Sequence, residues 1–199
     1  MKRQGVVPPR SVVVIGASTG GPTALEQVLL GLPAHAPAIV IVQHMGAKFT
    51  RAFAERLDRA CLIGVREAED GSPVRPGQAL VAAGDRHLRI VRHADDYVVR
   101  VSCDEAVNGH RPSVDVLFDS CAAVVGAASV GVLMTGMGQD GARGLRALRG
   151  AGAHTIAQDR ATCVVFGMPK AAIAMGAVAE VVPLHGIAAA ILARARPAT

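Results

Sequence analysis

The stretch VVVIGASTGGPTALEQVLLGL, residues 12–32, decides the fold class of this chain. Four aliphatic residues run directly into the glycine-rich turn GASTGG at 16–21, and a helix-like pattern follows at once. A short apolar run bounded by turn residues is typical of a strand buried on both faces. The stretch therefore predicts a strand, a tight turn and a helix, with Ser18 in the turn.

The same unit recurs along the chain. Further strands are predicted at 38–43, 130–135, 154–157 and 178–182, and helices at 22–31, 49–60, 113–127, 140–150, 168–176 and 186–195. This alternation indicates an α/β fold with a doubly wound, mainly parallel sheet flanked by helices. Short β-like runs separated by turn residues break the rhythm later, so we expect a small antiparallel β element around 78–102.

Length, charge and cysteine spacing limit the classes of protein to which this chain can belong. The 199 residues suit one domain, expected at 11–196 after a flexible lead-in at 1–10. The net charge is +5, but the basic residues are scattered and no dense run interleaves with aromatics, which argues against nucleic acid as a partner. The four cysteines form no C-x-x-C pair, and no apolar run is long enough for membrane insertion. A cytoplasmic protein is expected.

Ser18 admits three interpretations at this point. It could help to cradle a phosphate, cap the following helix, or act as a nucleophile. The stretch lacks both the Walker lysine and the G-x-G-x-x-G fingerprint, which weakens the phosphate interpretation. Residues 16–20 do match G-x-S-x-G, a turn that lifts a serine hydroxyl above the sheet. A serine nucleophile also needs a base, and the base needs an acid to orient it.

Two further polar residues follow predicted strands. His44 comes directly after the strand at 38–43, and Asp140 lies in the glycine-rich turn after 130–135. Since ligands bind outside the carboxyl ends of parallel strands, we expect both to converge on Ser18. The chain order Ser, His, Asp differs from that of the α/β-hydrolases, which disfavours that family. Asp159 is the alternative acid, although the adjacent Arg160 suggests a structural ion pair.

Seven segments together resemble the catalytic domain of the CheB-type protein-glutamate methylesterases, which reset bacterial chemoreceptors. They cover nearly the whole chain in family order: IGASTGGP (15–22), QHM (43–45), FTRAFAERLD (49–58), GDRHL (84–88), HRPSVDVLF (110–118), TGMGQDGARGL (135–145), and AQD with VVFGMP (157–169). The resemblance implies that Ser18, His44 and Asp140 form a catalytic triad. The oxyanion donors of the family match the neighbourhoods of Thr19 and Met137.

Further site residues and partners are expected on the same basis. Gly20, Gly21 and His110 are expected to line the oxyanion and substrate-binding region, since His110 leads into a predicted helix beside the crevice. The resemblance implies hydrolysis of glutamate γ-methyl esters on cytoplasmic helices of a methyl-accepting chemoreceptor, with glutamine deamidation as a second activity. No metal and no cofactor are expected.

The receiver domain that the family commonly carries is not expected within these residues, so a receiver domain acting in trans is a further partner. Two alternatives stay open at this point. One is a phosphate- or nucleotide-binding α/β module, and the other is a catalytically idle relative that only binds the receptor.

Overall fold

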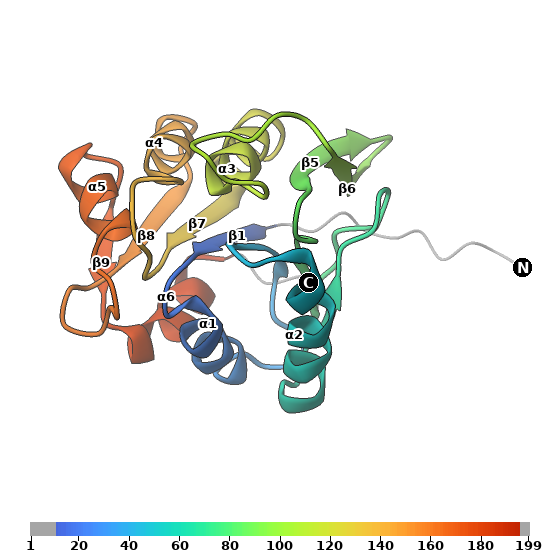
Figure 1. Ribbon diagram of the computed structural model, residues 1–199, viewed down its shortest axis with the longest axis horizontal. Coiled ribbons are helices and arrows are strands. Elements are labelled where there is room, and N and C mark those ends of the chain that lie inside the picture. Colours follow the sequence, from blue (N-terminus) through green and yellow to red (C-terminus); the bar gives the residue numbers. More distant parts are fainter. Residues whose placement is uncertain (1–10, 196–199) are drawn as a thin grey trace, which may run out of the picture.

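The computed structural model describes residues 11–195, so the predicted lead-in and residue 196 lie outside the described residues. Figure 1 shows a central sheet between two layers of helices. Within the described part of the chain, this sheet has seven parallel strands in the order β3 (Gly64–Glu67), β4 (Gln78–Val81), β2 (Ala38–Gln43), β1 (Val12–Ala17), β7 (Ser129–Leu133), β8 (His154–Gln158) and β9 (Glu180–Val182). The predicted doubly wound parallel sheet is confirmed.

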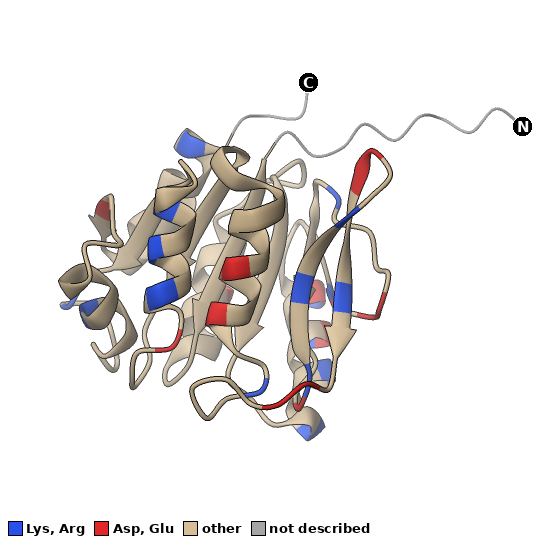
Figure 2. Ribbon diagram, turned by 90° about the horizontal axis from the view of Figure 1, so that it is seen from above, with Lys and Arg blue, Asp and Glu red and all other residues tan. Residues whose placement is uncertain are grey.

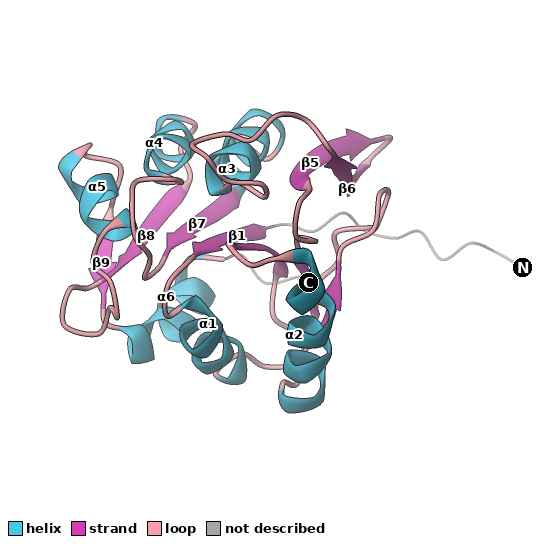
Figure 3. Ribbon diagram, viewed as in Figure 1, coloured by secondary structure: helices cyan, strands magenta, loops and turns pink. Residues whose placement is uncertain are grey.

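Helices cover both faces of the sheet (Figure 3). One face carries α1 (Gly21–Leu30), α2 (Ala47–Ala60) and α6 (Ile187–Arg194). The other carries α3 (Val114–Val124), α4 (Ala142–Gly150) and α5 (Met168–Ala174). Two single 3-10 turns, η1 (Gly126–Ala128) and η2 (Leu184–Gly186), complete the helical segments of the described residues. The predicted helix at 113–127 ends early because Gly126 adopts a positive φ of 59°.

Alternate residues of the central strands belong to the two opposite cores. In β1, Val13 and Ile15 pack in the core beneath α1 and α6, whereas Val12 and Val14 pack in the core beneath α3 and α4. All four side chains are fully buried. A parallel strand covered on both faces therefore reads as the continuous apolar run seen in the sequence.

The antiparallel element is smaller than predicted. It consists of the hairpin β5 (His87–His93) and β6 (Asp96–Ser102), which forms a separate two-stranded sheet beside α3. The expected start at residue 78 is wrong, because β4 pairs in parallel with β2 and β3 and belongs to the main sheet. Ala79, Leu80 and Val81 of β4 are all buried, as in the other inner strands of the main sheet.

The strand order reverses at β1. The chain leaves β1 for β2 on one side and later returns to pair β7 with its other side. In open parallel sheets, ligands bind outside the carboxyl ends of strands at such a switch point. The loops after β1, β2 and β7 therefore meet where a site is expected. Among residues 11–195, no helix has the length and apolar character needed to cross a membrane.

Helices α3 and α4 pack closely against each other. Arg143 on α4 pairs with Asp119 on α3 at 2.7 Å and approaches Asp115 at 3.5 Å. Figure 2 shows the basic residues of α4 beside acidic residues of α3. Gly144 permits this approach, because a Cβ there would lie 2.6 Å from Cβ of Phe118 and 3.1 Å from the Asp115 backbone.

Replacing this glycine should destabilise the fold. We expect Gly144→Ala to lower the free energy of unfolding by about 1–3 kcal/mol, the usual cost of overpacking, despite the better helix propensity of alanine. Gly150→Ala on the same helix is the matched control, since no atom lies within 4 Å of its added Cβ. Urea unfolding of both variants tests this, and equal stabilities would contradict the close-packing argument.

Candidate active site

Ser18, His44 and Asp140 all lie in loops at the switch point. Ser18 follows β1, His44 follows β2, and Asp140 lies in the loop between β7 and α4. The β1–β2 pairing continues to the ends of both strands, where Ala17 is opposite Gln43. The amide of His44 then donates a hydrogen bond to the Ala17 carbonyl at 3.0 Å. The backbones of Ser18 and His44 are therefore neighbours.

Backbone hydrogen bonds fix the turn that holds Ser18. Its amide donates to the carbonyl of Thr135 at 2.9 Å, and its carbonyl accepts from the amide of Gly21 at 2.8 Å. Gly20, with a φ of 80°, is the N-cap of α1, and no side chain caps this helix. The capping interpretation of Ser18 is thus not supported. The Ser18 side chain is half-buried and makes no hydrogen bond to His44 within residues 11–195.

Gln43 is a buried residue that the sequence analysis missed. Its Nε2 donates to the carbonyl oxygens of both Ser18 and His44, each at 3.0 Å. The side chain is only 2% exposed, and a Cβ on Gly21 would lie 1.9 Å from its Oε1. One amide group therefore ties together the loops of the two expected catalytic residues. In the sequence, the signal for this buried residue is a glutamine at the end of the apolar run AIVIVQ.

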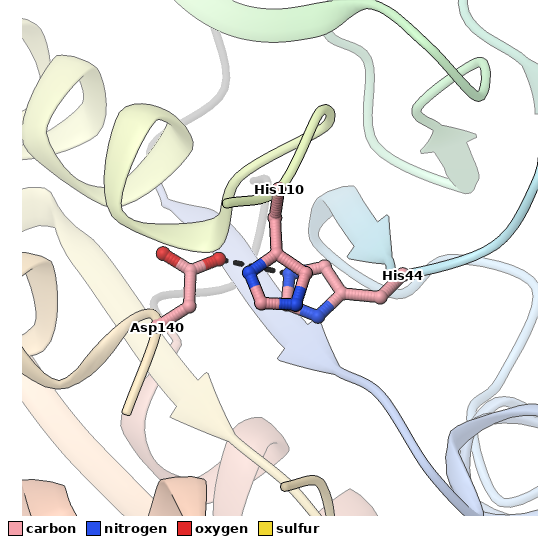
Figure 4. A group of neighbouring side chains, drawn as sticks. All are labelled: His44, His110 and Asp140. Carbon is pink, nitrogen blue, oxygen red and sulfur yellow. Dashed lines mark hydrogen bonds and ion pairs between the residues drawn. The ribbon is translucent and has the colours of Figure 1, made fainter. Parts of the chain in front are cut away.

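His44 and Asp140 form a buried hydrogen-bonded pair. Nε2 of His44 lies 2.8 Å from Oδ2 of Asp140, and their side chains are 8% and 1% exposed (Figure 4). A carboxylate can only accept, so Nε2 carries the hydrogen and Nδ1 of the neutral ring is the acceptor. Nδ1 is buried and has no hydrogen-bond partner among the described residues.

The Asp140 carboxylate accepts several further hydrogen bonds. Its other donors are Asn108 Nδ2 at 2.8 Å, Ser113 Oγ at 2.7 Å, and the amides of Val114 at 2.7 Å and Asp115 at 3.3 Å. Burial alone would raise the pKa of this carboxyl group. The hydrogen bonds outweigh burial and hold the pKa of Asp140 well below its usual range. The group is therefore a carboxylate at neutral pH.

These contacts place Asp140 at the N-terminus of α3. The amides of Val114 and Asp115 lie in the first turn of that helix, where backbone amides have no acceptor within the helix, and they donate to Asp140 instead. The helix dipole also stabilises an anion at this end. Ser113 occupies the N-cap position, but its hydroxyl donates to Asp140 and makes no cap hydrogen bond. The helix is thus capped by a residue from another loop, which no local pattern reveals.

The His110 ring lies face to face with the ring of His44. The two centroids are 3.9 Å apart and the planes differ by 11° (Figure 4). Nδ1 of His110 donates to the carbonyl of Asn108 at 2.8 Å, which leaves its Nε2 free of hydrogen in the neutral ring. The expected proximity of His110 to the site is confirmed, while its predicted role in substrate binding stays a prediction.

The expected oxyanion residues differ in whether their backbone amides already donate a hydrogen bond. Thr19 is exposed and Met137 is 72% exposed at the rim of the site. Neither amide donates to any acceptor in the part of the chain that the structure describes. The Gly21 amide, in contrast, is already used by the Ser18 carbonyl, so Gly21 cannot donate to an oxyanion. Gly20 contributes the left-handed turn described above.

Asp159 is not part of the His44 cluster. Its Oδ1 accepts from the amide of Thr162 at 3.0 Å and from the Thr162 hydroxyl at 2.5 Å. The expected ion pair with Arg160 is not present among residues 11–195, because this loop turns back on itself through Thr162. Asp159 therefore orders a local turn.

Donor atoms of His44, His110 and Asp140 lie within 4.8 Å of one another, which is close enough to consider a metal ion. A tetrahedral site needs ring nitrogens whose lone pairs converge on one point. The two stacked rings are nearly parallel, and the oxygens of Asp140 already accept five hydrogen bonds. The arrangement fits an oriented histidine–carboxylate pair better than a metal centre.

Comparisons with known proteins agree on one family. The family model of CheB methylesterase matches residues 13–191. A protein-glutamate methylesterase/protein-glutamine glutaminase of Pseudomonas aeruginosa is 56% identical over 92% of this chain and 53% of its own length. One from Cupriavidus pinatubonensis is 53% identical over 98% of this chain and 54% of its own length. The chain thus spans about half the length of these curated relatives.

A solved structure is also similar. The crystal structure of the Thermotoga maritima CheB methylesterase catalytic domain superposes with a TM-score of 0.90 at 39% sequence identity. The match covers 94% of this chain and 99% of that one. The likeness therefore extends over the whole sheet and its helices.

The low pKa of Asp140 predicts a pH-dependent contribution to stability. Because its pKa is lower in the folded state than the unfolded value of about 3.9, the carboxylate stabilises the fold fully above that value. This contribution falls as the pH drops towards the folded pKa. We expect Asp140→Asn to lower the free energy of unfolding by roughly 1–3 kcal/mol at pH 7, and by less at pH 3. Urea unfolding at both pH values measures the difference.

The control is Asp95→Asn, a substitution at an exposed position between β5 and β6. It should leave stability nearly unchanged at pH 7. A destabilisation by Asp140→Asn that is the same at pH 7 and pH 3 would contradict the argument.

Proposed function

Because the chain belongs to the CheB methylesterase family, we propose that it is a serine hydrolase that removes methyl groups from glutamate γ-methyl esters. The observation that carries this proposal is the buried His44–Asp140 pair beside the Ser18 turn, at the carboxyl ends of adjacent parallel strands. The substrate is a glutamyl ester on the cytoplasmic helices of a methyl-accepting chemoreceptor.

In the proposed reaction, Ser18 Oγ attacks the ester carbonyl while Nδ1 of His44 takes the serine proton. Nδ1 suits this role because it is the unprotonated nitrogen of the neutral ring and has no other partner among the described residues. Nε2 keeps its hydrogen bond to Asp140, whose negative charge stabilises the imidazolium. The two ring nitrogens thus exchange the roles that they have in Ser-His-Asp proteases, where Nε2 is the base.

The oxyanion of the tetrahedral intermediate is held by the amides of Thr19 and Met137, which are not engaged within residues 11–195. Each such donor contributes roughly 10²–10³ in rate. His44 then returns the proton to the departing methoxide, and methanol leaves. Water attacks the acyl-enzyme in a second cycle, with the same proton transfers, and releases the glutamate carboxylate and free Ser18.

Glutamine deamidation is proposed as a second activity of the same site. The curated relatives are named protein-glutamine glutaminases as well as methylesterases. An amide passes through the same tetrahedral geometry as an ester, with ammonia leaving in place of methanol. A receiver domain as regulatory partner and a cytoplasmic location stay predictions.

Ser18 is expected to be the only residue that a serine-directed fluorophosphonate labels. Wild-type protein should release methanol from methylated receptor and carry the adduct on Ser18, as read by peptide mass spectrometry. Ser18→Ala should lose both properties and keep its thermal unfolding midpoint. Thr23→Ala, which removes an exposed hydroxyl from α1, is the control and should keep both. A folded Ser18→Ala that still releases methanol would exclude Ser18 as nucleophile.

The acid is tested by comparing two aspartates. Asp140→Asn should lower kcat by up to about 10⁴, the effect of replacing the triad acid in serine proteases, because the amide favours the wrong histidine tautomer. Asp159→Asn should lower kcat little, since among the described residues the Asp159 carboxylate accepts hydrogen bonds from Thr162 alone. Methanol release at saturating receptor measures both, with circular dichroism to verify folding. The reverse order of effects would make Asp159 the acid.

A further inference from the structure

We propose that His110 is a positioning residue that acts through His44, holding the imidazole in the one orientation that pairs with Asp140. The inference rests on the proposed function of His44 as general base. It is an alternative to the expectation that His110 binds substrate. The observation behind it is the stacked pair of rings, with centroids 3.9 Å apart and planes within 11° of parallel.

The stack restricts the one motion that would disable the base. The His44 ring can turn about its bond to Cβ, and a turn out of its plane would break the hydrogen bond from Nε2 to Asp140. A ring of equal size lies flat against one face, so such a turn drives His44 into His110 (Figure 4). Together, the hydrogen bond and the stack define both the direction and the plane of the imidazole.

His110 can serve in this way because it is itself held firmly. Val107 and His110 exchange two backbone hydrogen bonds, of 3.1 and 2.9 Å, across a two-residue turn. Asn108 and Gly109 in that turn have φ values of 54° and 74°, the left-handed conformations of a type I′ turn. The Nδ1 hydrogen bond to the Asn108 carbonyl then sets the orientation of the His110 ring.

The same turn is tied to the acid. The side chain of Asn108 donates to Oδ1 of Asp140 at 2.8 Å and to Oδ2 of Asp115 at 2.8 Å. The stacking ring and the carboxylate are therefore joined through Asn108 on either side of His44. A loose loop could not supply this geometry, because a 1 Å displacement in a catalytic site already costs rate.

The stack also keeps water away from the base. The His44 side chain is 8% exposed, and the His110 ring covers one of its faces. When His44 takes the proton from Ser18, its attraction to Asp140 is stronger in a site from which water is excluded. The face of a neutral aromatic ring also favours an adjacent cation. These effects act in the transition state, so they raise kcat more than they alter KM.

Two variants of His110 separate positioning from substrate binding. His110→Ala removes the ring and should lower kcat about tenfold with little change in KM, as expected for the loss of one aromatic contact. His110→Phe keeps a flat ring of similar size and should restore most of kcat, although it cannot form the hydrogen bonds of an imidazole. His93→Ala, at an exposed position on β5, is the control and should match the wild type.

A spectroscopic measurement tests the geometry without relying on turnover. The proton of His44 Nε2 in its hydrogen bond to Asp140 should give a downfield proton NMR signal in the wild type and in His110→Phe. The signal should broaden or disappear in His110→Ala, and it should be absent from His44→Gln, which identifies it. Thermal unfolding establishes that each variant is folded.

The outcomes distinguish this inference from the proposed function. A raised KM with unchanged kcat in both His110 variants would assign His110 to substrate binding and overturn the inference. An unchanged NMR signal in folded His110→Ala would also overturn it. If the wild type released no methanol, the proposed function would fail, while the NMR comparison would still decide whether His110 orients His44.

Discussion

The carboxylate of Asp140 is a buried charge, and the site is built around its compensation. An unpaired carboxylate at 1% exposure would be costly, so each of its oxygens must accept hydrogen bonds. The donors come from His44, from the Asn108 turn and from the start of α3. One anion therefore joins the His44 loop to residues 108–114, although Asp140 lies 96 positions from His44 and 26 from Val114.

The Ser18 side of the site depends on neutral hydrogen bonds instead. Ser18 is held through its backbone by the carbonyl of Thr135 and by the side chain of Gln43, which also binds the His44 carbonyl. The Ser18 hydroxyl makes no hydrogen bond to another described residue. Because backbone groups carry the restraint, the turn can be rigid while this hydroxyl stays available.

The sequence predicted the elements that local periodicity defines. The strand predicted at 38–43 has the observed bounds, because strands buried on both faces are continuous apolar runs. Predictions that depended on a distant partner were less successful. The strand at 78–81 was expected in the antiparallel element, and Asp159 was expected to pair with Arg160.

By itself, the sequence determined the strand–turn–helix alternation, the parallel sheet and the positions of Ser18, His44 and Asp140 after strands. These follow from spacing along the chain, since the carboxyl ends of parallel strands meet at one edge. Only the tertiary structure decided that Asp140 caps α3, which nitrogen of His44 is free, and that His110 stacks on His44. These features depend on distances between residues up to 96 positions apart, which no local pattern encodes.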